Sequence, residues 1–309
     1  VAIVSRSASP DTDVDYLFVQ VVVGEGRVDT TPNCGNILAG VAPFAIETGI
    51  VAARDGVTPV RVRMLNSDNL CELLVETPGG RVNYDGAAKI DGVPGTSAPI
   101  VCNYLDVAGS ATGSLLPTGN VIDVVDGMEV TCVDNGMPVV VMRARDLGIS
   151  GYESPKELDG NREFKARVES IRLAIGPRMN LGDVTKKVVP KMSLVAPARA
   201  GGHVCTRTLI PHDTHAAIGV LGAVSVATAC ILPGSVTAGI ATVPDGPVKQ
   251  MSVEHPTGEF SVTLDVGGTP DTPVVQKAGL LRTARLIMRG EVLIPAAVWD
   301  GRQAARLAA

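Results

Sequence analysis

The sequences NILAGVAPFAIETG at residues 36–49 and AAIGVLGAVSVATAC at residues 216–230 decide the fold. Both have the spacing of helices, and both are apolar on every side. A helix without a polar face must be enclosed by the rest of the protein. Each stretch follows a strand-like segment and a short polar loop that opens with a proline, and strand-like sequence comes after each. We therefore predict two pseudo-symmetric halves, each a curved sheet or β-barrel around one central buried helix.

The sequence around these two helices predicts an α+β fold with many short, mostly antiparallel strands. In VRVRM at residues 60–64, arginine alternates with apolar residues, which is typical of a strand with one solvent-facing side. YLFVQVVVGEGRVD at residues 16–29 predicts a hairpin around Gly24-Glu25-Gly26. Residues 154–176 have apolar residues at helical spacing and predict an amphipathic surface helix that ends at Gly176-Pro177.

A chain of 309 residues is long enough for two domains. We place the first half at residues 1–124 and the second at 125–309, with its central helix at 216–231. The last strand-like segment, GEVLIP at 290–295, could close either half. The chain opens within strand-like sequence and without a methionine, so we expect a true N-terminus upstream of Val1.

Charge and cysteine usage exclude several classes of function. The net charge is −5, the pI is about 5.4, and no run of Lys or Arg is present, which argues against a nucleic-acid partner. No apolar run is long enough to span a bilayer, so no membrane partner is expected. The six cysteines are scattered without a CxxC pair, which is typical of a reduced, cytoplasmic protein. Such an acidic protein can bind an anion only through locally placed donors.

The starts of the two buried helices are the natural places for such donors, because free N–H groups and the helix dipole favour a carboxylate. Cys34, in the sequence PNCGN, lies at the start of the first helix, where a thiol can act as a general acid or base. The alternative is a small buried cysteine without a chemical role. Gly35 lets the backbone come close to a ligand.

Three other polar groups could contact a ligand. His212 and His215, in IPHDTHAAIG, could bind a metal or a carboxylate, and we favour substrate contact or structural hydrogen bonding over metal. Arg178, in GPRMNLGD, could bind a carboxylate through its planar fork or form a capping salt bridge. Ser67 lies in NSDN, which by itself is an ordinary polar turn. The sequence has no GxGxxG, Walker, GxSxG or HExxH motif.

Many motifs in one order resemble the family of 4-oxalomesaconate tautomerases and methylaconitate isomerases. They include PNCGNILAGVAPFAIETG, EVTCVDNGMPVV, RLAIGPRMNLGDV, HAAIGVLGAVSVATAC, VEHPTGEF and GLLRTARLIMRGEV. The resemblance covers essentially the whole chain and is strongest to the bacterial tautomerases of gallate degradation. It implies a diaminopimelate-epimerase-like fold.

The resemblance also assigns roles to residues. It implies that Cys34 is catalytic and that Asn33, Gly35 and Asn36 form a loop that cradles a carboxylate. A lysine directly before the equivalent of Val1 is the family's second acid or base. The related epimerases use a second cysteine, and alignment places Gly219 at that position. Further substrate contacts are expected at Ser67, Arg178, His212, His215, Leu221 and Gly222.

These expectations add up to an isomerase that moves a proton on 4-oxalomesaconate, by a keto–enol or allylic shift, without a metal or organic cofactor. One thiol with one amine suits proton transfer between two atoms better than inversion of one stereocentre, so Gly219 disfavours a racemase. The alternatives are a 2-methylaconitate cis–trans isomerase of propionate metabolism and a non-catalytic polycarboxylate-binding protein. The expected partner is a small tricarboxylic acid, and a homodimer is possible.

Overall fold

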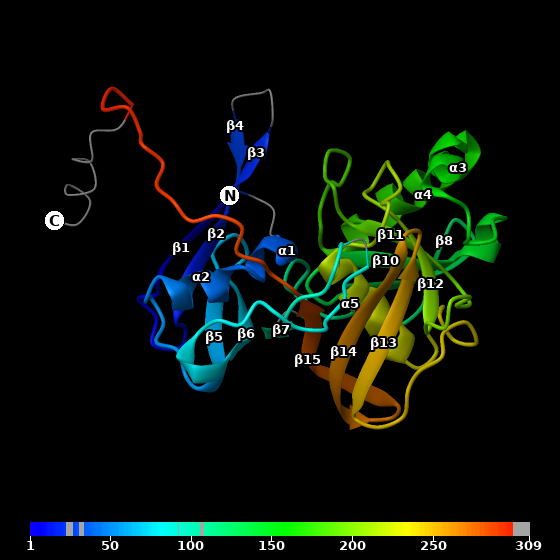
Figure 1. The fold of residues 1–309 in the computed structure, drawn as a ribbon. Helices are drawn as coiled ribbons and strands as arrows, with labels where there is room; N and C mark the ends of the chain where they lie inside the picture. The colour runs from blue at the N-terminus through cyan, green and yellow to red at the C-terminus, as the bar shows by residue number, and fades with distance from the viewer. Residues whose placement is uncertain (23–26, 31–33, 92, 106–107, 299–309) are drawn as a thin grey trace.

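The computed structural model describes residues 1–298, apart from residues 23–26, 31–33, 92 and 106–107. Figure 1 shows two lobes side by side, with β7 and β15 between them. The first lobe contains β1 (Ala2–Arg6), β2 (Val14–Phe18), β3 (Gln20–Val22), β4 (Arg27–Asp29), α1 (Gly35–Leu38), α2 (Val41–Glu47), β5 (Gly56–Met64), β6 (Asn69–Thr77) and β7 (Ile100–Leu105). The second contains β8 (Asp123–Val125), β9 (Met128–Asp134), β10 (Pro138–Arg143), α3 (Pro155–Gly160), α4 (Arg162–Ile175), β11 (Lys191–Ala196), β12 (Val204–Leu209), α5 (Val220–Ile231), β13 (Val248–His255), β14 (Gly258–Thr269) and β15 (Thr272–Arg282).

One continuous sheet of 13 strands runs through both lobes in the order β1-β2-β5-β6-β7-β15-β14-β13-β12-β11-β10-β9-β8. The lobes are joined where β15 pairs antiparallel with β7, with Leu280 opposite Cys102. β3 and β4 form a separate two-stranded ribbon, as the hairpin prediction required, and the turn at Gly24-Glu25-Gly26 lies outside the described residues. In β5, Val60 and Val62 are buried while Arg61 is exposed, which confirms the predicted alternation.

The same chain path places the central helix in each lobe. β2 and β5 pair in parallel, with Val14 opposite Val62, and α1 and α2 lie in the connection between them. β12 and β13 also pair in parallel, with Val204 opposite Val253, and α5 lies in that connection. Parallel neighbours need a crossover, which each central helix supplies. The α+β class and the two similar halves are therefore confirmed.

The two central helices differ in length. α5 is a single helix of 12 residues whose side chains are buried from Gly222 onward. The first predicted helix, by contrast, is divided into α1 of four residues and α2 of seven. Pro43 has no N–H to donate to the carbonyl of Ala39. Between α1 and α2, the N–H of Gly40 bonds to the carbonyl of Ile37, three residues earlier (3.0 Å). The expectation of one continuous helix over residues 36–49 is therefore wrong.

The predicted amphipathic helix covers the other face of the second lobe as α3 and α4. Ser154 forms a capping box with Glu157, and Asn161 ends α3 and caps α4 through a bond from Phe164 N–H (3.1 Å). Apolar residues at the predicted spacing are buried there: Leu158, Phe164, Val168, Ile171 and Ile175. β10 separates the layers, since Val139 and Val141 pack in the core that contains α5 while Val140 and Met142 pack in the core that contains α4.

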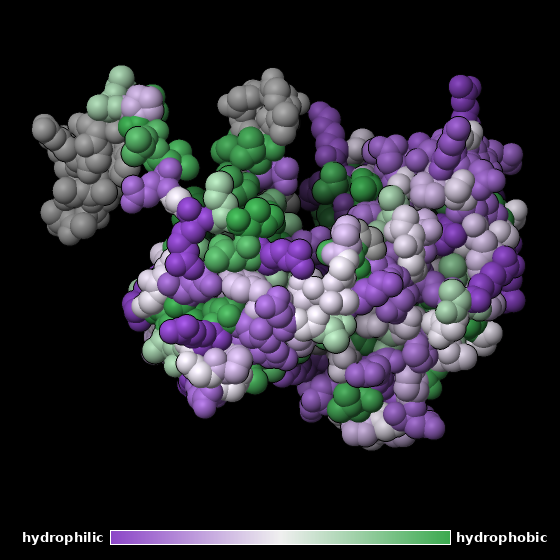
Figure 2. Space-filling model, in the orientation of Figure 1, coloured by the Kyte–Doolittle hydropathy of each residue, from purple (hydrophilic) through white to green (hydrophobic). Residues whose placement is uncertain are grey.

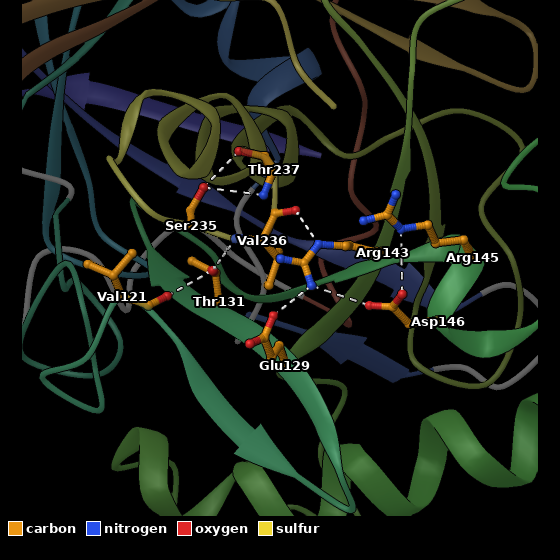
Figure 3. A network of polar contacts seen from close by, with 9 residues as sticks. All are labelled: Val121, Glu129, Thr131, Arg143, Arg145, Asp146, Ser235, Val236 and Thr237. Atoms are coloured by element: carbon orange, nitrogen blue, oxygen red, sulfur yellow. Dashed lines mark hydrogen bonds and ion pairs between the residues drawn. The ribbon is translucent and has the colours of Figure 1, made fainter. Parts of the chain in front are cut away.

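A polar network holds the C-terminal end of α5 (Figure 3). The hydroxyls of Ser235 and Thr237 donate to the carbonyl of Ala229 (2.7 and 3.2 Å). Thr131 accepts from Val236 N–H (3.0 Å), and Arg143 donates to the Val236 carbonyl (3.0 Å) and to the carboxylates of Glu129 and Asp146. These bonds fix the C-terminal end of α5 to β9 and β10. The first turn, at the opposite end of the helix, faces the other lobe.

The last part of the described chain departs from prediction. Residues 283–298 form no strand, so the expectation of a strand at GEVLIP is wrong, and β15 instead joins the two lobes. After Arg282 this segment leaves the sheet, and Figure 1 shows it passing α1 and running away from the first lobe. Large apolar side chains in this segment are exposed, among them Val292 (90%) and Leu293 (88%). Figure 2 shows hydrophobic groups that stand apart from the two lobes. Within the described residues, no helix has the length and apolar character needed to cross a membrane.

Candidate active site

Cys34 is the residue directly before the first turn of α1, and its backbone is extended. The side chain is half-buried and makes no capping hydrogen bond. The hydroxyl of Tyr16, a buried residue of β2, donates to the carbonyl of Cys34 (3.2 Å), and the N–H of Leu38 donates to the same oxygen (3.1 Å). Burial, followed by the nearby Cys34, raises the pKa of Tyr16, so this hydroxyl stays protonated as a donor. The backbone of Cys34 is therefore held while its thiol remains free to react.

The turn between β5 and β6 supports the chain that leads into Cys34. The side-chain amide of Asn66 donates to the carbonyls of Phe18 (2.8 Å) and Thr30 (2.6 Å), and its oxygen accepts from Phe18 N–H (2.8 Å). Ser67 is the next residue in this turn and is exposed. Asn33 lies outside the described residues, and Asn36 is an exposed residue of α1.

The starts of the two central helices meet at Gly35. A Cβ atom added to Gly35 would lie 2.7 Å from the hydroxyl oxygen of Tyr104 and 3.1 Å from Cγ1 of Val220, the first residue of α5. A larger residue here would therefore force the Tyr104 hydroxyl to move and would crowd Val220. The starts of α1 and α5 therefore lie next to each other, and Cys34 is the residue directly before this contact.

The first turn of α5 offers free donors to open space. The helix begins after Gly219, which has no side chain to cap it. The N–H groups of Val220, Leu221 and Gly222 have no partner within the helix. A Cβ on Gly219 would meet no atom within 4 Å. The dipole of a 12-residue helix adds partial positive charge at this end. Because α1 has only four residues, α5 has the larger dipole of the two central helices.

Two histidines lie beside the loop that enters α5. The Nδ1 atom of His215 accepts from Ala217 N–H (2.9 Å), and Nδ1 of His255 accepts from Thr257 N–H (3.3 Å). Burial is the main cause that lowers the pKa of both rings, with Lys191 adding to it for His215. Both imidazoles are therefore neutral near pH 7 and carry their proton on Nε2, where each can donate a hydrogen bond. Thr257 also donates to the carbonyl of Ala216 (2.9 Å), which ties the two histidine loops together.

A half-buried thiol, a helix start with uncapped N–H groups and neutral imidazole donors suit acid–base chemistry on an anionic substrate. Comparison with known proteins agrees. The model of the family described as PrpF protein matches residues 1–295.

The chain belongs to the PrpF protein family.

Relatives of this PrpF protein are named as isomerases or tautomerases. It is 58% identical to the (4E)-oxalomesaconate Delta-isomerase of Novosphingobium sp. (strain KA1), over 95% of this chain and 82% of the relative. It is 53% identical to the 4-oxalomesaconate tautomerase of Pseudomonas putida KT2440, over 97% and 82%. The crystal structure of a methylitaconate-delta-isomerase matches with a TM-score of 0.83 at 31% identity, over 94% of this chain and 80% of that one. The predicted diaminopimelate-epimerase-like fold is thereby confirmed, as is membership of a family of isomerases.

Two of the predicted contacts of the PrpF protein are engaged elsewhere. Arg178 donates to the carboxylate of Asp123 (2.5 Å), a buried residue of β8, and so forms a salt bridge in this structure. His212 lies 3.7 Å from the carboxylate of Glu169 on α4 and is 59% exposed. His212 and His215 therefore face different partners. Among the described residues, no three side chains of the metal-binding types gather as a metal site.

The other thiols of the PrpF protein belong to the core. Cys71, Cys102, Cys132, Cys205 and Cys230 are buried, and burial raises the pKa of each. Only Cys34 is partly exposed, which sets it apart as the residues alone suggested. Sequence reasoning missed Tyr104 and His255. His255 is the last residue of β13, in VEHPTGEF, so its place near His215 could have been found only by knowing that the end of β13 lies beside the loop before α5.

Proposed function

We propose that this PrpF protein isomerises 4-oxalomesaconate by a keto–enol or allylic proton shift, with Cys34 as one of the two groups that carry the proton. The observation that carries the proposal is the place of Cys34: a half-buried thiol whose neighbour Gly35 contacts the start of α5, where backbone donors are free. The names of the two relatives that share more than half of their residues supply the substrate.

The reaction needs one proton removed and one returned. A base takes the acidic proton from the carbon between the unsaturated system and a carboxylate, and the electron pair delocalises into the conjugated carbonyl as a dienolate. The N–H groups at the start of α5 stabilise this charge. An acid then returns a proton at the far end of the conjugated system, so the composition of the substrate is unchanged. Cys34 performs one transfer, and the lysine that the resemblance places before Val1 performs the other.

Turnover tests the proposal directly. Protein that carries the lysine that the resemblance places directly before Val1 is mixed with 4-oxalomesaconate while the enol or enone absorbance is followed. Fast conversion that is lost in Cys34→Ala supports both the substrate and the role of the thiol. A Cys34→Ser variant with full turnover would contradict the role of the thiol and leave the substrate assignment standing.

Two alternatives remain open to the same assay. Conversion of 2-methylaconitate at a higher kcat/KM than 4-oxalomesaconate would favour the propionate-pathway isomerase. Binding of both acids without turnover, and without exchange of their carbon-bound protons in heavy water, would favour a non-catalytic binding protein. A cytoplasmic location, absence of a cofactor and a possible homodimer stay predictions.

A further inference from the structure

Arg282, the last residue of β15, is a buried cation without an anion. Only 8% of the residue is exposed, and its guanidinium carbon lies 4.0 Å from the centroid of the Phe260 ring. Nη1 donates to the carbonyl of Leu281 (2.9 Å), whereas Nε has no partner. Within the part of the chain that is described, no carboxylate forms an ion pair with Arg282. Proteins rarely bury an unpaired charge unless a ligand supplies the opposite charge.

Tyr104, on the neighbouring strand β7, is a second buried donor without a partner. The residue is 1% exposed, and its hydroxyl makes no hydrogen bond. That hydroxyl points to Gly35, at the contact between the starts of α1 and α5. Burial is the main cause that raises the pKa of Tyr104, so the group is a neutral O–H donor.

The two side chains lie on one face of the sheet. β7 and β15 pair with Tyr104 opposite Ala278 and Ile100 opposite Arg282, and residues 278 and 282 are four positions apart on one strand, so their side chains share a face. Burial is the main cause that lowers the pKa of Arg282, and Cys102 and Tyr104 act against it. In turn, Arg282 acts against the burial that raises the pKa of Tyr104. Figure 1 places this strand pair where the two lobes meet.

We propose that Arg282 and Tyr104, together with the first turn of α5, bind one carboxylate of the substrate at the junction of the two lobes. This inference rests on the proposed function for the identity of the acid, but it adds two binding residues from β7 and β15. All the unpartnered groups here are donors: a guanidinium Nε, a phenolic hydroxyl and backbone N–H groups. A carboxylate satisfies them together and neutralises the buried cation.

The test uses tricarballylate, a saturated tricarboxylate that cannot tautomerise, in calorimetric titrations at fixed ionic strength. Arg282→Gln removes the charge, and we expect binding at least about tenfold weaker. Tyr104→Phe removes only the hydroxyl, and we expect binding about tenfold weaker. Arg285→Gln is the matched control. Arg285 is an exposed arginine three residues after Arg282, and its side chain donates to the carbonyl of Thr96. The affinity of this variant for tricarballylate should stay within about twofold of the wild-type affinity.

Thermal stability separates binding from a structural role. The Tyr104 hydroxyl has no partner to lose, so Tyr104→Phe should melt at the wild-type temperature or above it. A lower melting temperature with unchanged affinity would overturn the proposal. This variant keeps the test valid if Arg282→Gln fails to fold.

Turnover of 4-oxalomesaconate distinguishes this inference from the proposed function. Wild-type turnover, combined with unchanged KM and unchanged tricarballylate affinity in both variants, overturns the Arg282–Tyr104 site and leaves the function intact. If the wild-type protein binds tricarballylate but does not turn over 4-oxalomesaconate, and both variants bind tricarballylate more weakly, the site is supported and the proposed function is refuted. If the wild-type protein does not bind tricarballylate, and the KM for 4-oxalomesaconate is the same in both variants as in the wild type, the site is also overturned.

Discussion

Cys34 and Gly219 occupy corresponding places in the two lobes. Each directly precedes the first helical turn in the crossover between a pair of parallel strands, and each has an extended backbone, with φ and ψ of −130° and 102° for Cys34 and −68° and 146° for Gly219. One position carries a thiol, and the other has no side chain and faces open space. These two positions therefore do not supply two thiols that could act on opposite sides of one substrate carbon. This arrangement is the one expected for an isomerase rather than a racemase.

Gly219→Ala should reduce substrate binding without harming the fold. The backbone angles of Gly219 suit alanine, and the added methyl group meets no atom within 4 Å, so we expect the free energy of unfolding to change by less than about 1 kcal/mol. The methyl group would occupy space in front of the free N–H groups of α5, so KM should rise at least about tenfold. Steady-state kinetics and denaturant unfolding check the two parts. An unchanged KM would place the substrate away from α5.

Cys34→Ala should abolish turnover while the protein stays folded. The thiol accepts or donates the transferred proton, and loss of a general acid or base lowers kcat by about 10²–10⁴-fold. The side chain is half-buried and makes no capping hydrogen bond, so the melting temperature should change little. Cys71→Ala is the matched control, because that thiol is buried in the core. It should lose stability and keep its kcat.

Residue patterns predicted the architecture because it depends on burial. The apolar sequence at 216–230 is enclosed from Gly222 onward, and the alternation in β5 fixed which side faces the core. The apolar sequence at 36–49 is enclosed only in part, since Ile37 (39%) and Phe44 (49%) are exposed. The same patterns could not show that Pro43 would divide the first helix, since proline is also tolerated in the first turn of a helix.

The site was harder to predict than the fold. Cys34 stood out by its place before a helix, whereas Tyr104 and Arg282 have strand-like neighbours and look like ordinary core and edge residues. Their role depends on the pairing of β7 with β15, which are more than 160 residues apart in the sequence and meet only after the sheet has formed. Arg178 shows the opposite difficulty: its sequence context allowed two roles, and the ion pair with Asp123 depends on a residue that is distant in the sequence.

Gly35→Ala should destabilise the protein through a defined contact. The new Cβ would lie 2.7 Å from the Tyr104 hydroxyl and 3.1 Å from Val220, and overpacking of this kind costs about 1–3 kcal/mol. Combining it with Tyr104→Phe removes the closer obstacle and should restore about 1 kcal/mol, whereas the contact with Val220 remains. A double-mutant cycle by denaturant unfolding measures this coupling, and additive effects would show that the two residues do not touch.

His255 should make stability depend on pH between neutral and mildly acidic conditions. Its pKa is lowered in the folded protein, mainly by burial, so the unfolded chain binds a proton before the folded protein does as pH falls below about 6.5. The stabilisation is therefore complete above that pH and is lost as pH falls toward the folded pKa. His255→Gln should show a smaller loss of unfolding free energy between pH 7 and pH 5 than the wild type. His212→Gln, which removes a 59% exposed imidazole, is the matched control. Equal pH slopes for His255→Gln and the wild type would mean that this ring titrates alike in both states, and that it is not held neutral beside His215.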